Sequence, residues 1–236
     1  MPIVVTGLSH HSSPVELRER FAFSNTQVAD ALGQVHQRGI ADEAVILSTC
    51  NRVEIYAATR ESNPVLGQAL EQFLCDFHGI APAPGHALYT HLEPQSVDHL
   101  FRVSCGIDSM VLGETEILGQ LKQAYKLAHA EKATGALLNK TFQKAFHVAK
   151  LVRSETQIQR GSISVSSVAV ELAESIFDSL KSQQVLVIGA GDTSEKAARA
   201  LRNRGAQSIL VSNRSHDRAI ALAAELDGRA IGFDTW

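Results

Sequence analysis

Apolar runs of strand length alternate with amphipathic segments over the first 90 residues, a pattern typical of mixed strands and helices. The predicted strands are residues 3–5, 44–47, 53–58 and 87–90. The predicted helices are residues 14–20, 25–39 and 66–78, and residues 81–85 are predicted to be a loop. For the first helix we expect Ser12 or Ser13 as the cap and Pro14 in the first turn, while Gly79 closes the last helix.

The pattern between residues 96 and 159 is helical, with few β-branched runs to interrupt it. Gly106, Gly113 and Gly119 cluster in one part of this stretch. Because glycine adopts backbone conformations that other residues avoid, the cluster predicts a bend or a close approach of two backbone segments.

A small, polar joint at residues 161–167 separates this helical part from a second domain. A connecting helix is predicted over residues 168–180 and ends at residues 181–184. Residues 185–188 then form a strand of the buried type, which leads into a glycine loop and a helix through residues 197–201.

The glycine loop has the spacing of a dinucleotide-binding turn, with Ser194 where the third glycine usually stands. Gly189 permits the tight turn, and Gly191 lets the backbone approach a pyrophosphate at the positive end of the following helix. Such a loop is a weak signal alone, but the flanking strand and helix and a second strand at residues 208–211 strengthen it. The residues of the loop expected to contact the cofactor are Gly189, Ala190, Gly191, Asp192, Thr193 and Ser194.

The end of the second strand distinguishes between the two nicotinamide dinucleotides. NAD sites usually place Asp or Glu there to bind the ribose 2′-hydroxyl, whereas residues 212–215 contain no acid. Asn213 and Arg214 suit the extra phosphate, so the predicted cofactor is NADPH. A helix over residues 216–226 and a strand over residues 229–232 complete half of such a domain, and we expect the chain to be truncated.

Composition and cysteine usage set the broad class. The 236 residues are 44% hydrophobic and 20% charged, which is ample for a packed core and argues against disorder. No apolar run approaches the roughly 20 residues that a membrane span needs, and no signal peptide is visible. Cys50, Cys75 and Cys105 stand at unrelated spacings, so we expect neither a disulfide framework nor a metal site, in a cytoplasmic protein.

Positive charge is concentrated between residues 121 and 160. That segment holds eight basic and two acidic residues, a net charge of +6, whereas the whole chain carries −3. The pairs Lys122/Lys126 and Lys140/Lys144 are four apart, which places each pair on one helical face. Such a cluster could contact an RNA backbone, but ordinary surface charge alone favours a solvated helix face.

The segment after residue 47 carries the candidate chemistry. Thr49-Cys50-Asn51-Arg52 follows a predicted strand and precedes another, which places a thiol at the end of a sheet. A neighbouring guanidinium favours the nucleophilic thiolate, and Arg52 could alternatively bind a substrate carboxylate with two hydrogen bonds. The alternative is a buried cysteine at a strand end beside a solvated arginine.

The chain resembles the glutamyl-tRNA reductase family in blocks that keep the family's order across nearly the whole sequence. The blocks are residues 7–11, 14–20, 48–54, 99–103, 106–114 and 117–120, followed by the glycine loop. The resemblance implies an α/β protein with an N-terminal α+β catalytic, glutamyl-tRNA-binding domain at residues 1–160. A connecting helix at residues 161–181 and a partial Rossmann-type NADP-binding domain at residues 182–236 would follow.

The family reduces glutamyl-tRNA(Glu) to glutamate-1-semialdehyde with NADPH, which begins porphyrin (tetrapyrrole) synthesis from glutamate. The resemblance implies that Cys50 attacks the acyl ester and forms a thioester, which a hydride then reduces. The family forms homodimers through a C-terminal domain absent here, so this chain is expected to perform at least the acyl-transfer or esterase half. Whether the aminomutase that acts on glutamate-1-semialdehyde docks on it is left open.

The resemblance also implies a set of substrate-binding residues. They are Thr49, Asn51, Arg52, Ser109, Glu114, Thr115, Glu116 and Gln120. Thr115 and Glu116 stand where the family commonly has Pro and Gln, which adds a carboxylate to the expected pocket. His99 takes the place of an activity-critical histidine, with an acid/base or polarising role, although a lone histidine at a helix start is often structural.

The remaining histidines and cysteines receive structural predictions. We expect His10 and His11 to be structural or to contact substrate, and Cys75 and Cys105 to be packed in the core. Two rival functions stay open at this point. One is an inactive RNA-binding or protein-binding module of the same fold, and the other is an NADP-dependent aldehyde dehydrogenase that uses Cys50.

Overall fold

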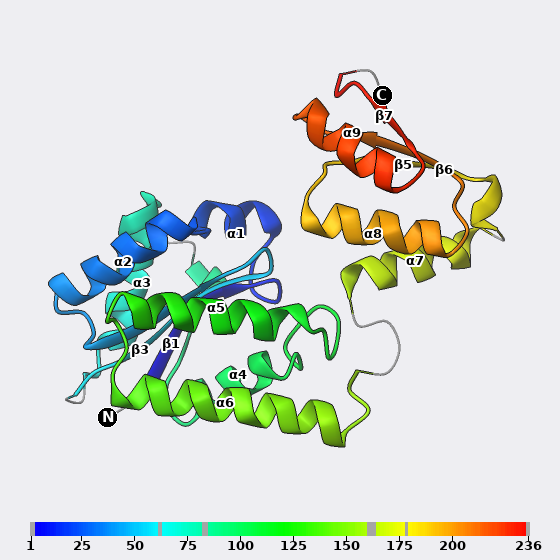
Figure 1. Ribbon diagram of the computed structural model, residues 1–236. Coiled ribbons are helices and arrows are strands. Elements are labelled where there is room, and N and C mark those ends of the chain that lie inside the picture. Colours follow the sequence, from blue (N-terminus) through cyan, green and yellow to red (C-terminus); the bar gives the residue numbers. More distant parts are fainter. Residues whose placement is uncertain (1–2, 61–62, 82–84, 160–163, 178, 235–236) are drawn as a thin grey trace. The chain divides into compact units, whose positions relative to one another are not determined.

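The computed structural model describes residues 3–60, 63–81, 85–159, 164–177 and 179–234 (Figure 1). The chain forms two compact units, Met1–Gln159 and Arg160–Trp236. Each unit has its own buried apolar cluster, so each is described by itself.

The first unit is built on a four-stranded sheet in the order β2–β3–β1–β4, in which every neighbouring pair is antiparallel. The strands are β1 (Ile3–Ser9), β2 (Glu43–Ser48), β3 (Arg52–Ala58) and β4 (Tyr89–His91). All four confirm the predicted strands in outline. The last one begins later than predicted, because a 3-10 turn, η1 (Gly85–Ala87), occupies its expected start.

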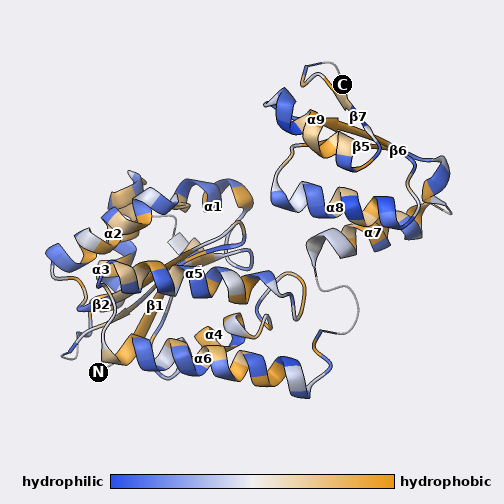
Figure 2. Ribbon diagram, viewed as in Figure 1, coloured by the Kyte–Doolittle hydropathy of each residue, from blue (hydrophilic) through white to orange (hydrophobic). Residues whose placement is uncertain are grey.

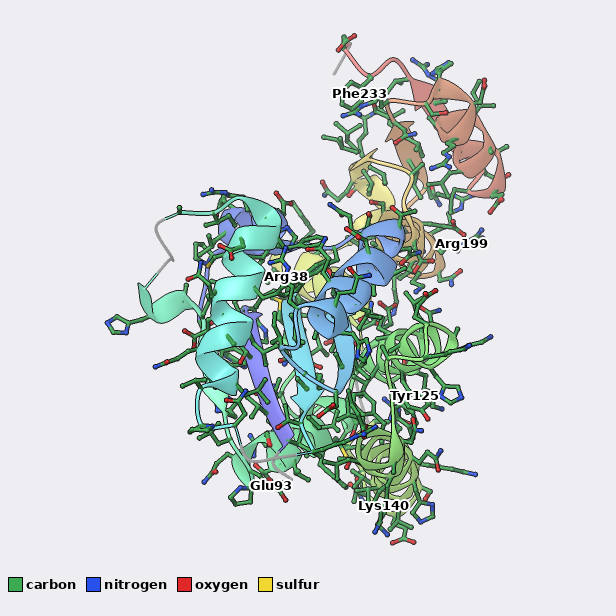
Figure 3. All side chains as sticks on the ribbon, turned by 90° about the vertical axis from the view of Figure 1, so that its left-hand side faces the viewer. Arg38, Glu93, Tyr125, Lys140, Arg199 and Phe233 are labelled. Carbon is green, nitrogen blue, oxygen red and sulfur yellow. The ribbon has the colours of Figure 1, made fainter. Side chains whose placement is uncertain are left out.

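Helices cover both faces of this sheet. Every residue of β1 and β3 is buried, so neither strand shows the alternation that marks a sheet with one solvated face. In Figure 3, α3 (Leu66–His78) lies on one side of the sheet, and α5 (Glu116–Ala130) and α6 (Ala136–Glu155) lie on the other. Figure 2 shows the apolar colouring of β1, whereas α5 and α6 carry both polar and apolar colours.

The two N-terminal helices are capped differently from one another. In α2 (Asn25–Gln37) the Ser24 side chain and the Gln27 side chain form a reciprocal capping box. The prediction that Ser12 or Ser13 caps α1 (Val15–Phe21) is wrong, since Pro14 takes the cap position without a side-chain bond.

The hydroxyls of the two serines hold the preceding turn instead. Ser13 Oγ donates to the Ser9 carbonyl at 3.2 Å, and Ser12 Oγ donates to the Ala87 carbonyl at 2.8 Å. The residues chosen as cap candidates therefore tie the end of β1 to the segment before β4.

The predicted glycine bend lies between α4 (Gln95–Ser104) and α5. Gly106 and Gly113 have φ of 73° and 77°, and the Gly113 N–H donates to the Gly106 carbonyl at 2.9 Å. A Cβ on Gly113 would lie 2.1 Å from the Ile158 carbonyl oxygen, so glycine is required there by both backbone and space. Gly119 does not contribute to the bend, because it lies inside α5.

The second unit is a three-stranded parallel sheet in the order β5–β6–β7. Its strands are β5 (Gln184–Ile188), β6 (Ser208–Ser212) and β7 (Arg229–Ile231). Its helices are α7 (Val165–Ile176), α8 (Asp192–Asn203) and α9 (His216–Glu225), with a 3-10 turn, η2 (Leu180–Ser182), before the sheet.

This strand–helix alternation is the first half of a Rossmann-type fold, which confirms the predicted fold class. The predicted connecting helix begins and ends earlier than residues 168–180, as α7, and it contributes Val170 to the core of the second unit. Residues 161–163 of the predicted polar joint lie outside the described residues, as do residues 82–84 of the predicted loop.

Candidate active site

A tight turn between β2 and β3 presents Cys50. The Thr49 hydroxyl accepts hydrogen bonds from the backbone N–H groups of Asn51 and Arg52, both at 3.1 Å, and the Thr49 N–H donates to the Arg52 carbonyl at 2.8 Å. These bonds close the turn locally and leave Cys50 at its tip, exposed and unoxidised. The thiol is therefore open to an incoming reactant.

The Arg52 side chain, in contrast to the exposed Cys50, is buried. It is only 1% exposed. Because side chains two residues apart share one face of a strand, Arg52 lies on the same face of β3 as Glu54 and Tyr56. The alternative of a buried cysteine beside a solvated arginine is therefore wrong on both counts.

Glu54 is the centre of a buried polar network under the turn. Its Oε1 accepts hydrogen bonds from Arg52 Nη1 at 2.8 Å, from His99 Nε2 at 2.7 Å and from the Tyr89 hydroxyl at 2.5 Å. Its Oε2 accepts from the Tyr56 hydroxyl at 2.5 Å. Four donors from β3, β4 and α4 thus converge on one carboxylate that is completely buried.

The network keeps Glu54 ionised and the two tyrosine hydroxyls protonated. Burial alone would raise the pKa of Glu54, but the Arg52 guanidinium and the bonds from His99 and Tyr56 hold that pKa well below its usual value. Burial and the Glu54 charge raise the pKa of the Tyr56 and Tyr89 hydroxyls, so both stay protonated donors. An ionised Glu54 is an acceptor only, so neutral His99 carries its proton on Nε2 and exposes Nδ1 as an acceptor.

Asp108 completes the network from the loop between α4 and α5. Its Oδ2 lies 3.0 Å from Arg52 Nη2, which also donates to the Asp108 backbone carbonyl. Its Oδ1 lies 3.6 Å from His11 Nε2. Arg52 is therefore held by carboxylates on two sides, one buried and one partly exposed.

Ser109 and Glu114 lie on the same loop and contact each other. Ser109 Oγ donates to Glu114 Oε1 at 3.3 Å, and the Glu116 N–H donates to Glu114 Oε2 at 3.1 Å. Burial raises the pKa of Glu114. The Arg153 guanidinium donates to the Glu114 carbonyl at 3.1 Å and so ties the loop to the end of α6.

The remaining predicted substrate residues are more dispersed. Thr115 is exposed as the cap residue of α5, and Glu116 opens that helix. Gln120 lines a pocket of about 110 Å³ between α2, β2 and α5, together with Phe23 and Ser48. The structure thus groups Arg52, His99 and the Ser109–Glu114 loop more closely than it groups Gln120 with them.

The structure also describes the other cysteines and the two histidines after β1. Cys75 and Cys105 are buried, as predicted. The His10 N–H donates to the Asn51 carbonyl at 2.8 Å, which supports the turn, and burial lowers the pKa of the His10 imidazole. The His11 ring packs against the His10 ring with centroids 3.9 Å apart and the ring planes tilted by 38°.

Three residues of the site have no role in the predictions from sequence. Glu54 stands in the quoted motif, but its place at the centre of the network depends on β4 and α4, which are distant in sequence. Asp108 lies beside the predicted Ser109. Arg18 on α1 donates from Nε to the Cys50 carbonyl at 3.2 Å, so it is the cation that contacts residue 50 directly.

The glycine loop of the second unit has the geometry of a phosphate-binding turn. Gly189 has φ of 96°, and its N–H donates to the Ser212 carbonyl at 2.7 Å. Gly191 caps α8 without a side-chain bond, and nothing lies within 4 Å of the position that a Cβ there would take. The open N-terminus of α8 therefore fits a pyrophosphate.

The side chains next to this turn form an open pocket of about 440 Å³. Asn213 Oδ1 accepts from the Ala190 N–H at 3.2 Å and so holds the loop against the end of β6. Arg214, a predicted cofactor-binding residue, lines the pocket, and so do Arg218 on α9 and Phe233. Two guanidiniums on one pocket suit a phosphate group, and Arg218 was detectable in the sequence as the arginine four residues after Arg214.

Two classes of site find no support in the part of the chain that the structure describes. Within that part, no group of three or more His, Cys, Asp or Glu side chains could hold a metal ion. No helix among the described residues is long and apolar enough to cross a membrane.

These features define a class of protein. It is a two-unit α/β protein with an exposed cysteine on one unit and a dinucleotide-type loop on the other. Family models agree with that class. Residues 6–156 match the N-terminal domain of glutamyl-tRNA(Glu) reductase, and residues 171–235 match shikimate / quinate 5-dehydrogenase.

Individual relatives carry the same name as the first of these models. The glutamyl-tRNA reductase of Akkermansia muciniphila is 46% identical over 236 residues, which are all of this chain and 69% of that protein. The Geobacter metallireducens enzyme is 45% identical over 99% of this chain and 54% of its own length. The solved glutamyl-tRNA reductase of Methanopyrus kandleri is 36% identical, with a TM-score of 0.63 over 98% of this chain and 54% of that one.

The chain therefore belongs to the glutamyl-tRNA reductase family. It spans about half the length of most of the relatives quoted above. The activity of those longer proteins comes to this chain as a proposal.

Proposed function

We propose that this chain accepts the glutamyl group of glutamyl-tRNA(Glu) on Cys50 and that, with NADPH on the second unit, it reduces that group to glutamate-1-semialdehyde. The exposed Cys50 above a buried Arg52–Glu54–His99 network is the observation that carries the proposal. A catalytic nucleophile has to be accessible, while the groups that position it and its substrate gain strength from burial. The reaction is the first step of tetrapyrrole synthesis from glutamate.

The first covalent step is transfer of the glutamyl group from the tRNA to Cys50. The Cys50 thiolate attacks the carbonyl carbon of the aminoacyl ester, the C–O bond breaks, and the tRNA leaves with a proton on its terminal hydroxyl. A glutamyl thioester remains on Cys50. A dinucleotide held by the turn from Gly189 to Ser194 would supply the hydride for reduction of this thioester to the aldehyde, and Cys50 would leave as the thiolate when the C–S bond breaks.

His99 is the residue proposed to move the proton. Because Glu54 takes the Nε2 hydrogen, the imidazole is fixed in orientation and its Nδ1 is free to accept or return a proton. The Arg18 guanidinium on the Cys50 carbonyl adds a fixed positive charge beside the thiolate.

The glutamate pocket is proposed to lie between the Cys50 turn and the Ser109–Glu114 loop. Arg52 would receive the side-chain carboxylate of the substrate, and Glu114 or Glu116 would meet the α-ammonium. Arg52 Nη2 already holds Asp108, so a substrate carboxylate has to share that nitrogen or replace Asp108. Thr49, Asn51, Thr115 and Gln120 are proposed to border the same pocket.

The dinucleotide is proposed to bind with its pyrophosphate on the turn from Gly189 to Ser194 and its 2′-phosphate between Arg214 and Arg218. The open N-terminus of α8 and the two arginines on the adjoining pocket support this placement.

Trapping the acyl group tests the proposal. Glutamyl-tRNA with a radiolabelled glutamyl group is incubated with the protein without NADPH, and label on the protein and free labelled glutamate are both measured. We expect label on the wild type, or release of glutamate by slow hydrolysis, and neither with Cys50→Ser. Cys105→Ser is the matched control, since it removes a buried thiol, and it should keep both signals.

Other outcomes point to the rival functions. Persistence of the adduct in Cys50→Ser would remove Cys50 from the mechanism. Binding of tRNA without any adduct would indicate a binding module, and indifference to tRNA would favour an aldehyde dehydrogenase.

A further inference from the structure

Six lysines project from α5, α6 and the connection between these two helices. They are Lys122, Lys126, Lys132, Lys140, Lys144 and Lys150. All six are exposed, and none forms a salt bridge with a residue that the structure describes. Exposed cations on α8 behave differently, since Lys196, Arg199 and Arg202 each pair with a carboxylate.

Four of these lysines lie on two helices that pack against each other, Lys122 and Lys126 on α5 and Lys140 and Lys144 on α6. Figure 1 shows α5 and α6 side by side, and Figure 3 labels Tyr125 on one and Lys140 on the other. The Tyr125 hydroxyl donates to Asn139 Oδ1 at 3.0 Å, and its ring stacks on Phe142 with centroids 5.6 Å apart. These contacts fix the register of the two helices, so Lys122 and Lys126 are held beside the helix that carries Lys140 and Lys144.

This surface, Lys122–Lys126–Lys140–Lys144, starts close to the candidate active site. Glu114, which contacts Ser109, lies just before α5. That helix begins at Glu116, and Lys122 lies six residues further along it. At about 1.5 Å per residue, Lys122 and Lys126 lie roughly 9 and 15 Å along the helix axis from its start.

We propose that the Lys122–Lys126–Lys140–Lys144 surface binds the phosphate backbone of the RNA whose acyl end enters the site. This proposal rests on the proposed function, because the RNA is the leaving group of that reaction. Unpaired lysines on rigid helices bind phosphates as point charges, and the release of counterions from the RNA drives the association.

RNA fits this surface better than a membrane or a protein partner. The exposed large apolar residues of the first unit are Val15, Val65, Leu92, Ile107, Met110, Leu112 and Leu151. Only Leu151 of these lies on α5 or α6, whereas a membrane-binding helix has a continuous apolar face beside its lysines. Protein interfaces also deplete lysine in favour of aromatic residues and arginine.

Charge reversal in pairs tests the proposal. Lys122→Glu/Lys126→Glu and Lys140→Glu/Lys144→Glu each change the net charge by −4 at positions where glutamate is as good a helix former as lysine. The matched control, Arg20→Glu/Arg60→Glu, makes the same change at exposed residues of the first unit that lie outside α5 and α6. Affinity for uncharged tRNA is measured by filter binding at several salt concentrations.

We expect each lysine pair to raise Kd by about tenfold or more at low salt and to flatten the slope of log K against log salt by roughly 1.5. The control should match the wild type. Equal Kd values for the lysine variants and the control would overturn the proposal. So would a lysine-dependent preference for anionic lipid vesicles or polyglutamate over tRNA when these are used as competitors.

A second measurement separates this surface from the chemistry at Cys50. Acyl transfer from a small glutamyl thioester without RNA should be unchanged in both lysine variants. If no variant, including the wild type, reacts with that thioester, the proposed function fails, and the tRNA affinities still decide the role of the lysines.

Discussion

The two units handle charge in contrasting ways. The first unit buries Arg52 and Glu54 at 1% and 0% exposure and surrounds them with further donors. The second unit keeps its ion pairs on the surface, for example between Arg202 and the 84% exposed Asp227. The polar network beneath Cys50 in the first unit is therefore part of its core, while the dinucleotide site of the second unit consists of backbone turns and arginines on an open pocket.

This difference predicts how each site responds to mutation. Removing one partner of a buried ion pair leaves an uncompensated charge in the core, whereas surface pairs contribute little. Function and stability should therefore be lost together in the first unit and separately in the second.

The largest effect is expected from Glu54→Gln. This change leaves Arg52 without its buried counterion and puts an NH2 donor where one of the two accepting oxygens stood, so we expect the first unit to lose about 3–5 kcal/mol of unfolding free energy. Urea denaturation followed by circular dichroism measures the loss. Tyr89→Phe removes one donor from the same carboxylate and should cost only about 1 kcal/mol, so equal losses in the two variants would contradict the central role of Glu54.

The pH dependence of stability gives the next test. Since the pKa of Glu54 is lowered in the folded state, its contribution is complete above its unfolded value of 4.5 and is lost as the pH falls further. The difference in unfolding free energy between wild type and Glu54→Gln should be constant from neutral pH to about pH 5 and narrow below about 4.5. A difference that grows on acidification would show that folding does not lower the pKa of Glu54.

Asp108→Asn should have a smaller effect than Glu54→Gln. The Asp108 carboxylate is 18% exposed, and Arg52 keeps its bond to Glu54, so we expect a loss of about 1–2 kcal/mol. In the acyl-transfer assay, loss of this competing carboxylate should lower KM for the glutamyl substrate more than it changes kcat. An unchanged KM would indicate that Asp108 does not compete for Arg52.

The smallest effect on stability is expected from Arg214→Gln in the second unit. Its side chain lines an open pocket, so the unfolding midpoint should not move. Binding of NADPH, followed by fluorescence, should weaken by about tenfold or more, while binding of NADH should change little, because only NADPH carries the 2′-phosphate. Equal weakening of both would show that Arg214 does not read that phosphate.

Much of the fold was predictable from local signals. Apolar runs located the strands, and the left-handed Gly79 ends α3 where the sequence places it. The cap of α1 was not predictable, because Ser12 and Ser13 find acceptors on Ser9 and on Ala87, which is distant in sequence. Gly119 was assigned to the bend by proximity alone, although glycine is tolerated inside a long helix such as α5.

The candidate site was predictable in its residue types but not in its connections. Cys50, Arg52 and His99 were identified from motifs, while the inward direction of Arg52 follows from a pairing with Glu54 and Asp108 that only the folded sheet and loop create. The unpaired state of the lysines on α5 and α6 likewise depends on what surrounds them in space. Local sequence identifies the residue types of the site, and tertiary contacts determine the orientation of their side chains.

Peptide mapping of the acylated protein tests the account most directly. The protein is incubated with glutamyl-tRNA in the absence of NADPH, digested at acid pH to preserve thioesters, and analysed by mass spectrometry. We predict a single glutamyl modification on the peptide that contains Cys50, lost on treatment with hydroxylamine. A glutamyl group on Cys75 or Cys105 instead, or an unmodified Cys50 while tRNA is deacylated, would contradict the account.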